Sequence, residues 1–489
     1  MASDTLELSA WELSAKIRSG ELQAEDHICI LFDHIKKIES KIKSYISIDE
    51  EGAINQAKAL DKKVKAGDKV GKLCGVGIAI KDNICTLNLR TTCGSRMLEN
   101  YVSPFDATVI ERIKHEDGII VGKTNMDEFA MGSSTEHSYF GSTHNPWDIS
   151  RVPGGSSGGS AASIAAQEAT LALGGDTGGS IRCPSSFCGV TGIKTTYGLV
   201  SRYGMVSYAN SLEQIGPIAK NVRDCSLMLE VIAGYDRRDS TSVKDKTEEY
   251  TKALGGGIDN LKIGIPKEFY AEGIDPAVED SVLEAVSKIE GAYKVSSNEL
   301  SLERVADALP AYYIIAMSEA SSNLARYDGV RYGFRIEDKT YDWSTVFGKD
   351  REMGFGQEVK RRIILGTFAL SAGYYDQFYL KAQKIRTLIV EDFTRAFKKV
   401  DVLVTPTMPI LPFKIGEKIS DPIQMYLCDV DTVPINLAGL PSISIPCGFK
   451  RGLPVGLQLI APPFREDLLI KVASAFEQTL KVNKTPKLE

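Results

Sequence analysis

Apolar residues recur at helical spacing along the first 70 positions. One set repeats every three or four residues and therefore lies on one face of a helix. Its members are Ile28, Leu31, Ile35, Ile38 and Ile42. Further upstream, Ser9 and Glu12 have the Ser-x-x-Glu spacing of a capping box, and Gly20 follows as a stop signal. Residues 1–70 are therefore predicted to form a helical segment whose role is packing.

The hydrophobic pattern changes near residue 72. Short apolar runs now alternate with glycine-rich turns, which is typical of buried strands in an α/β sheet. The predicted strands are 76–80, 119–121, 170–173, 261–265, 402–404, 443–445 and 455–460. A helix of small residues is expected at 160–169. The region 275–400 is predicted to be mainly helical, with a long amphipathic segment at 374–398.

Because predicted strands come from both ends of the chain, we expect one domain over residues 1–489. Within it, 1–70 forms the helical segment, 72–235 the glycine-rich core, and 261–489 the part that completes the sheet. A more polar stretch near 236–260 separates the last two parts. No internal repeat and no low-complexity linker is visible in the sequence.

Composition and charge narrow the class of protein. The 489 residues are 43% hydrophobic and 25% charged, which is ordinary for a globular protein. The net charge of −6 argues against a nucleic-acid binder working alone, although a partner chain could hold an RNA. Nine scattered cysteines without a Cys-x-x-Cys pair favour reduced thiols in a cytoplasmic compartment. The sequence contains no run of about 18 apolar residues, so no transmembrane helix is expected.

Two glycine-rich loops carry the candidate chemistry. The first, 154–160, reads Gly-Gly-Ser-Ser-Gly-Gly-Ser, and the second, 176–180, reads Asp-Thr-Gly-Gly-Ser. Such a composition alone is typical of a flexible linker. The first loop also matches the G-x-S-x-G nucleophile elbow, whose catalytic histidine follows the serine. All five histidines precede Ser156, so an elbow of that order cannot be built here.

A serine–lysine mechanism is the third interpretation of these loops. Lys81 follows the apolar run 76–80, so it should lie at the end of a buried strand. Burial disfavours the charged ammonium, and a neutral lysine can then activate a serine hydroxyl as its base. Backbone N–H groups of Thr177, Gly178 and Gly179 could converge on a developing oxyanion.

Two other sites are disfavoured by the residues. The stretch 118–124 resembles a phosphate-binding loop but is one residue short, and its central residues are apolar strand formers. We therefore predict a strand there. Cys183 and Cys188 are the closest cysteines, but no histidine follows His144, which argues against zinc. No metal and no cofactor is expected in this chain.

The glycine-rich loops and Lys81 resemble the signature of the amidase-signature family. The resemblance runs from Lys81 to about residue 217 and includes 153–160 and 176–182. It implies an α/β fold in which helices cover both faces of a large mixed β-sheet. By the same resemblance, Ser180 is the nucleophile, Ser156 a proton relay after a cis non-proline peptide bond, and Lys81 the base. Ser157 would have a supporting role.

Over nearly its full length the chain resembles the A subunits of glutamyl-tRNA(Gln) amidotransferases. Arg362, in Glu-Val-Lys-Arg-Arg, matches a carboxylate-binding arginine, Asp429 an ammonium-binding aspartate, and Tyr312 a substrate-contacting tyrosine. Free glutamine carries both charges, and a guanidinium suits a carboxylate. Without the resemblance, 360–362 would simply be a solvated helical face.

The resemblance implies a glutaminase subunit in the cytoplasm, or in an organellar matrix. It would hydrolyse glutamine through an acyl-enzyme and pass ammonia to a partner B subunit. That partner would use ATP and Mg²⁺ to amidate Glu-tRNA(Gln), and also Asp-tRNA(Asn) in some members, with a small C subunit bracing the pair. A stand-alone amidase acting on a small carboxamide is the alternative, and a non-catalytic scaffold the third class.

Overall fold

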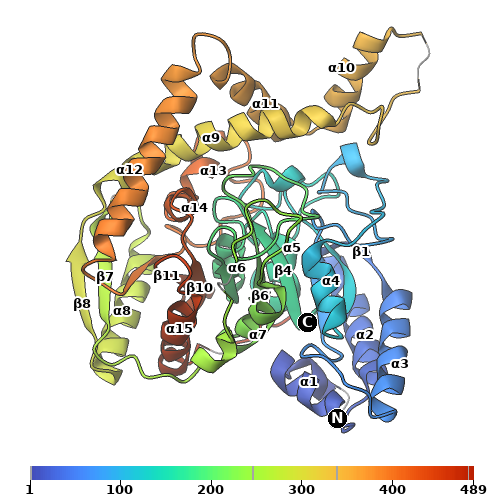
Figure 1. The fold of residues 1–489 in the computed structure, drawn as a ribbon, viewed down its shortest axis with the longest axis vertical. Helices are drawn as coiled ribbons and strands as arrows, with labels where there is room; N and C mark the ends of the chain where they lie inside the picture. The colour runs from blue at the N-terminus through green and yellow to red at the C-terminus, as the bar shows by residue number, and fades with distance from the viewer. Residues whose placement is uncertain (1–2, 245–246, 272, 338–339, 483, 489) are drawn as a thin grey trace.

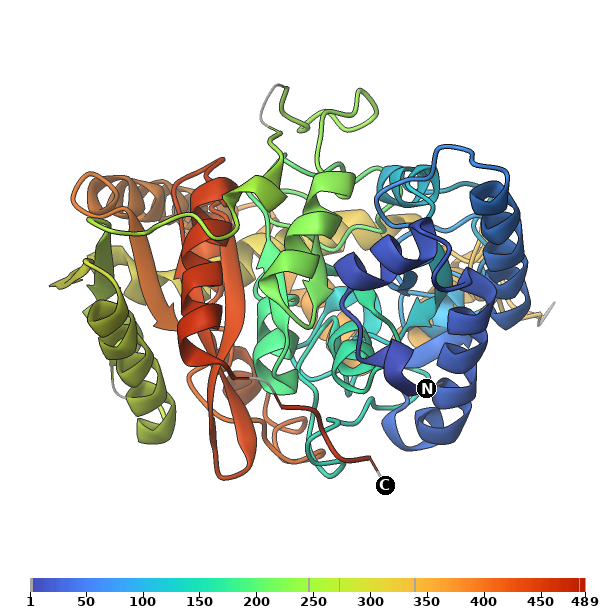
Figure 2. The ribbon, with the colours of Figure 1, turned by 90° about the horizontal axis from the view of Figure 1, so that it is seen from below.

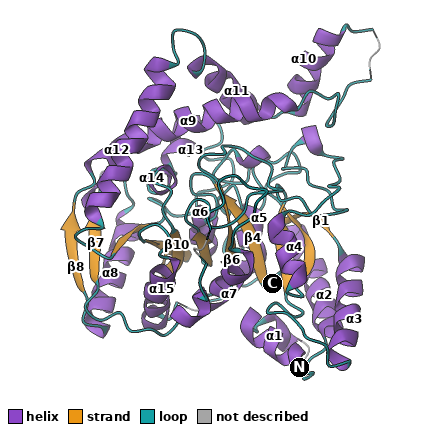
Figure 3. Cartoon of the chain, in the orientation of Figure 1, coloured by secondary structure: helices purple, strands orange, loops and turns teal. Residues whose placement is uncertain are grey.

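One mixed sheet of eleven strands forms the centre of the computed structural model, which describes residues 3–244, 247–271, 273–337, 340–482 and 484–488 (Figures 1 and 3). Across the sheet the order is β1-β3-β2-β4-β6-β5-β10-β11-β9-β7-β8. The strands are β1 Tyr45–Ile48, β2 Gly77–Lys81, β3 Ile119–Thr124, β4 Leu171–Asp176, β5 Thr191–Lys194, β6 Gln214–Ala219, β7 Lys262–Pro266, β8 Ser296–Leu300, β9 Val402–Pro406, β10 Ser442–Lys450 and β11 Leu453–Ile460.

Both strand directions occur in this sheet. β2 is parallel to β3 and to β4, whereas β4 runs antiparallel to β6. β5 and β10 pair antiparallel, with Ile193 opposite Ile443, and this ladder joins the N-terminal and C-terminal halves of the sheet. The predicted strands in both halves are confirmed, and so is the strand at 118–124, which is β3.

Helices cover both faces of the sheet, as expected. They are α1 Ala10–Arg18, α2 Ala24–Ile42, α3 Glu50–Lys65, α4 Thr108–His115, α5 Gly158–Ala165, α6 Arg182–Cys188, α7 Val222–Ile232, α8 Pro276–Ala292, α9 Ala308–Asn323, α10 Trp343–Gly354, α11 Gln357–Ala369, α12 Lys381–Ala396, α13 Pro422–Leu427, α14 Val433–Leu437 and α15 Glu466–Leu480. α5 and α6 pack on one face, and α7, α8 and α15 on the other. Figure 2 shows the second group beside the N-terminal helices.

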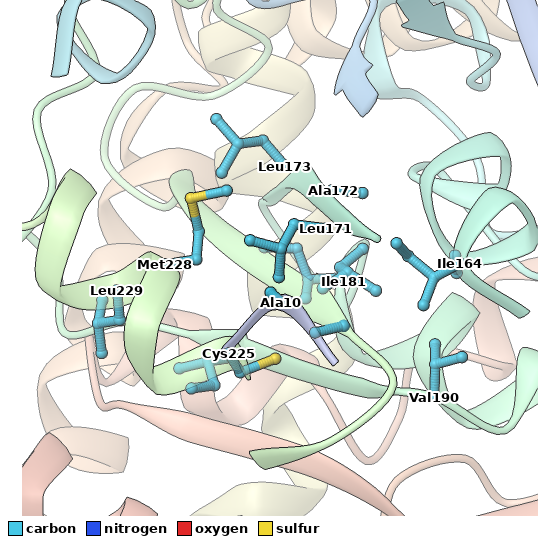
Figure 4. Packing of buried hydrophobic residues seen from close by; sticks show 14 of the residues in the cluster. Ala10, Ile164, Leu171, Ala172, Leu173, Ile181, Val190, Cys225, Met228 and Leu229 are labelled. Carbon is cyan, nitrogen blue, oxygen red and sulfur yellow. The ribbon is translucent and has the colours of Figure 1, made fainter. Parts of the chain in front are cut away.

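The core is densest where β4 passes between the two helical layers. Figure 4 shows Leu171 and Leu173 of β4 with Ile164 of α5 on one side and Met228 of α7 on the other. All four side chains are fully buried. At about 1.5–3 kcal/mol for each large apolar side chain removed from water, this packing fixes β4 and the loop that follows it.

A bundle of helices lies over one end of the sheet, at the top of Figure 1. α9 packs against α11, α12 and α14, so the bundle is built from residues beyond 300. It meets the strand ends directly, because a Cβ on Gly178, just after β4, would lie 2.3 Å from the Tyr312 hydroxyl of α9. The bundle therefore brings C-terminal side chains to the glycine-rich loops.

Three predictions of local structure are corrected. The first 70 residues are not helical throughout, because β1 adds a short edge strand antiparallel to β3. The region 275–400 is mainly helical as predicted, although it also contains β8. The small-residue helix is α5, which ends earlier than residue 169 because Gln167 has a φ of +61°. The 374–398 segment begins with a π-helical turn, Asp376–Leu380, before α12.

The capping box predicted at the start of α1 is confirmed. The Ser9 hydroxyl accepts from the Glu12 N–H while the Glu12 carboxylate accepts from the Ser9 N–H, which completes the capping box of α1. The cysteines are free thiols. Among the described residues, no helix is long and apolar enough to cross a bilayer. In the same residues, no cluster of three or more His, Cys, Asp or Glu side chains could hold a metal ion.

Candidate active site

Lys81 is the last residue of β2 and is fully buried. Its Nζ donates to Ser156 Oγ at 2.7 Å and to the Gly175 carbonyl at 3.0 Å. Burial lowers the pKa of Lys81 to about 7, against the opposing influence of the Asp127 and Asp176 carboxylates. A substantial neutral fraction near pH 7 is what a lysine needs to act as a base. The structure thus joins Lys81 and Ser156 as the sequence predicted.

Ser156 lies in the tight loop before α5. The Gly155–Ser156 peptide bond is cis, as the resemblance implied. Glycine is needed at 155 because a Cβ there would lie 2.1 Å from Asp127 Oδ2. Asp127 in turn accepts from the backbone N–H groups of Thr135 and His137, so it braces the loop from outside.

Ser180 lies between β4 and α6, in the second glycine-rich loop. Its carbonyl accepts from the Ser157 N–H at 3.1 Å, which ties the two loops together. The side chain is 7% exposed, whereas Ser156 and Lys81 are fully enclosed. Ser180 Oγ makes no hydrogen bond within the described parts of the chain. Catalytic hydrogen bonds often tighten only when substrate binds. Ser180 is therefore the member of the set that a substrate reaches.

The Ser180 loop is organised by Asp176 at the end of β4. The Asp176 carboxylate pairs with the Arg182 guanidinium at 2.9 Å and accepts from the N–H groups of Gly179 and Ile181. Burial alone would raise the pKa of Asp176, but the Arg182 charge holds it well below its usual value. The Gly179 N–H is thus already used, while those of Thr177 and Gly178 find no partner among the described residues.

Arg362 is brought to this loop by α11. The side chain is 3% exposed, and its Nε donates to Glu358 one turn earlier at 2.8 Å, while Nη1 donates to Tyr208 Oη at 2.8 Å. Its Cζ lies 5.3 Å from the ring centroids of Tyr313 and Tyr426. Arg362 is therefore a fixed, buried cation in an aromatic pocket, and not part of a solvated helical face.

Asp429 supplies the opposite charge in the same pocket. One of its oxygens accepts from Ser133 Oγ and the other from Tyr313 Oη, each at 2.7 Å. Burial raises the pKa of Asp429 to about 6, although these two hydrogen bonds favour the carboxylate. Tyr313 therefore connects the two charges, because its ring faces Arg362 and its hydroxyl binds Asp429.

The charged pocket adjoins the Ser180 loop through α9 and Thr432. Tyr312 lies against Gly178, and Thr432 Oγ1 donates to both the Gly178 carbonyl and the Asp429 carbonyl. Gly179 has a φ of +137°, and a Cβ there would lie 2.4 Å from Thr432 Oγ1. All the residues predicted from the sequence thus come together in one site.

Several residues of the site were missed. They are Asp127, Ser133, Asp176, Arg182, Tyr208, Tyr313, Glu358 and Tyr426. Glu358 had a usable signal, because it stands four residues before Arg362 and can pair with it on one helix. Ser133 and Tyr208 had none, since they reach the pocket only through the tertiary fold.

The geometry can perform amide hydrolysis with selection of an amino acid. A buried lysine can move a proton through Ser156, and Ser180 can attack a carbonyl beside free backbone N–H groups. One buried cation and one buried anion nearby suit an α-carboxylate and an α-ammonium. Cys183, 0% exposed, has a pKa that burial raises well above the usual value, which disfavours a reactive thiolate.

Comparison with known proteins also indicates an amidase. The family model described as Amidase matches residues 27–470. The A subunit of glutamyl-tRNA(Gln) amidotransferase from Carboxydothermus hydrogenoformans is 55% identical over 98% of this chain and 99% of its own length. The protein of the same name from Methanosarcina mazei is 57% identical over 96% of each chain.

Solved structures are also similar. The crystal structure of the glutamyl-tRNA(Gln) amidotransferase A subunit from Thermotoga maritima is 40% identical and superposes with a TM-score of 0.79, covering 100% of this chain and 98% of that one. A bacterial aryl acylamidase of the amidase signature family is 24% identical with a TM-score of 0.84, covering 96% of each chain. At that identity the second likeness shows the fold alone.

Proposed function

The chain belongs to the amidase family, and we propose that it is the glutaminase component, the A subunit, of a glutamyl-tRNA(Gln) amidotransferase. It is an amidase-type enzyme whose substrate in this role is free glutamine. One observation carries the proposal: Arg362 and Asp429 meet at Tyr313, beside the loop that bears Ser180. A general amide hydrolase has no need for that pair, but an enzyme for a free amino acid does.

The proposed reaction begins with proton transfer from Ser180 through Ser156 to neutral Lys81. Ser180 Oγ then attacks the side-chain carbonyl of glutamine, and the N–H groups of Thr177 and Gly178 stabilise the oxyanion. The proton held by Lys81 returns to the leaving nitrogen, so ammonia departs and a γ-glutamyl ester remains on Ser180. Water, activated by the same groups, releases glutamate and restores the serine.

The ammonia is the useful product in this role. The chain is one subunit of a multi-subunit amidotransferase, so a partner consumes what Ser180 releases. In the proposed assembly a B subunit holds ATP, Mg²⁺ and most of the Glu-tRNA(Gln), and a C subunit braces the pair. The net charge of −6 supports a tRNA held mainly by the partner.

Ser180→Ala tests the proposal in the assembled enzyme. With glutamine as nitrogen donor, amidation of Glu-tRNA(Gln) should be abolished, because no acyl-enzyme can form. With ammonium chloride as donor, amidation should continue at the wild-type rate, because the partner chemistry is untouched. Loss of both activities would show that Ser180 does something other than glutamine hydrolysis.

Arg362→Ala separates this function from that of a stand-alone amidase. The KM for glutamine should rise about 30-fold or more, as expected when one member of a buried charge pair with the substrate is removed. The matched control is Lys360→Ala on the same helix, since the Lys360 ammonium donates to the Glu352 carbonyl and not to a residue of the charged pocket. A KM unchanged by Arg362→Ala would favour an amidase for a small uncharged carboxamide.

A further inference from the structure

A second cavity of about 380 Å³ lies behind the segment that carries Asp429. Its walls come from residues 268–271 and 273–274, which follow β7, from 409–410 after β9, and from α13 with the residues that follow it. Most of the lining is apolar: Phe269, Ile274, Pro409, Ile410, Leu427 and Val430. The lining includes neither Arg362 nor Asp429 nor Tyr313.

Asp431 is the one acidic side chain of this cavity without a partner among the described residues. It is 4% exposed, its Oδ2 is fully buried, and neither carboxyl oxygen makes a hydrogen bond within the described chain. Glu268, the other acid of the wall, accepts from Ser301 and from the Leu302 N–H. Leaving a buried polar group unpaired destabilises a folded protein, so the presence of this one calls for a ligand.

Among the described residues that line the cavity, the one basic side chain does not pair with Asp431. Lys418 also lines the cavity, but its Nζ donates to Gln424 at 3.3 Å and lies 5.6 Å from the centroid of the Phe413 ring. Burial alone keeps the pKa of the Asp431 carboxyl well above its usual value. A cation that enters from outside would favour the charged form of this carboxyl and could pair with it.

Exposed apolar residues on and just before α13 form an apolar rim on this side of the cavity. Leu427 lines the cavity and is 50% exposed, and Ile423 on the same helix is 70% exposed. Ile419, just before α13, is 41% exposed. An apolar rim beside a buried, unpaired carboxyl group matches a polypeptide segment that inserts one basic side chain and covers its surroundings with apolar ones.

We propose that this cavity is a docking site for a lysine or arginine side chain of the partner protein, held by Asp431 and flanked by apolar residues that cover α13. The inference rests on the proposed function, which supplies the partner. A free small cation has the same charge chemistry but leaves the apolar rim exposed.

Docking here would bear directly on glutamine binding. Asp429 and Asp431 are two residues apart, and their carboxyl groups face the glutamine pocket and the docking cavity respectively. Thr432, the next residue, donates to the Gly178 carbonyl of the Ser180 loop. A side chain seated on Asp431 would hold this short segment, and with it Asp429, in the arrangement that binds glutamine.

Asp431→Asn tests the docking site in the full-length chain with its purified partner subunits. The substitution keeps size and polarity but cannot carry charge, so the Kd of the complex should rise about 10-fold or more. The partner concentration for half-maximal glutamine hydrolysis should rise in proportion. Asp33→Asn makes the same change at an exposed position of α2 and should alter neither value.

A second variant guards against misfolding as an explanation. Asp431→Leu removes an unpaired buried polar group, so the isolated chain should unfold at an equal or higher urea concentration while the complex still weakens. A Kd within twofold of wild type for both variants would overturn the docking site. The small cation n-butylguanidinium, which mimics an arginine side chain, serves as a probe of the cavity. If it competes with the partner for binding to the wild-type chain, the proposal is supported.

Two further results would count against it. If n-butylguanidinium binds the wild-type chain but Asp431→Asn leaves partner affinity unchanged, the cavity takes a free small cation and the docking proposal is wrong. If the wild-type chain does not bind the partner proteins at all, the proposed function itself fails, and this inference fails with it. Failure of the proposed function can be distinguished from failure of the docking site, because it is observed with the wild-type chain before any substitution is made.

Discussion

Acidification should lower glutamine hydrolysis in two separate steps. Lys81 must be neutral to take the proton of Ser180, and burial lowers its pKa to about 7. Asp429 must be charged to hold the ammonium of glutamine, and burial raises its pKa to about 6. Both groups therefore lose their working form as pH falls, the lysine by gaining a charge and the aspartate by losing one.

The size of each step follows from these two values. At pH 5 the neutral fraction of Lys81 is lower by about 100-fold than at high pH, and the charged fraction of Asp429 by about 10-fold. Saturating glutamine keeps Asp429 ionised, so kcat should fall about 100-fold. The ratio kcat/KM should fall about 1000-fold. A plot of log(kcat/KM) against pH should have a slope of one between pH 6 and 7, and the slope should approach two below pH 6.

The assay is glutamate release from pH 5 to 9 by the assembled enzyme. Asp429→Asn should abolish the extra pH dependence of KM below pH 6 while leaving the break in kcat near pH 7. Lys194 provides a matched control. Burial also lowers its pKa to about 7, but its ammonium donates to the Thr195 carbonyl and not to Ser156. Lys194→Met should keep the break near pH 7.

Two outcomes would refute this reasoning. A flat kcat from pH 5 to 9 would remove Lys81 from the role of base. A kcat that still rises tenfold per unit above pH 8 would mean that Lys81 keeps its ordinary pKa and that burial does not tune it.

Three further predictions concern the scaffold of the site. Arg182→Met leaves the Asp176 carboxylate buried without its cation, so the free energy of unfolding in urea should fall by about 3–5 kcal/mol. Gly178→Ala places a Cβ 2.3 Å from the Tyr312 hydroxyl, so kcat for glutamine should fall at least about tenfold while the circular dichroism spectrum stays unchanged. Glu358→Ala frees the Arg362 guanidinium from its hydrogen bond, so KM should rise several-fold with kcat nearly constant; an unchanged KM would deny Glu358 a positioning role.

The sequence was most informative where local pattern and chemistry coincide. The apolar run before Lys81 predicted a buried strand ending at a buried lysine, and β2 ends there. Helical spacing likewise predicted α2, and the Ser9 capping box predicted the start of α1. In each case the signal lies within a few residues, so no knowledge of the tertiary fold is needed.

Features that depend on contacts between distant parts of the chain could not be predicted from the sequence. β1 is four residues long and is a strand only because the edge of β3 is beside it. Ser133 and Tyr208 enter the glutamine pocket because Asp429 and Arg362 arrive from the far end of the chain. The unpaired state of Asp431 also exists only in the folded molecule, since it depends on which groups surround the carboxyl.

Capture of the acyl-enzyme tests the central claim most directly. The assembled enzyme is mixed with glutamine, quenched in acid within one turnover, digested and analysed by tandem mass spectrometry. The account predicts one γ-glutamyl ester, on Ser180, and none in the Lys81→Met variant. An adduct on Ser156 or on Cys183, or glutamate release with no adduct on Ser180, would contradict it.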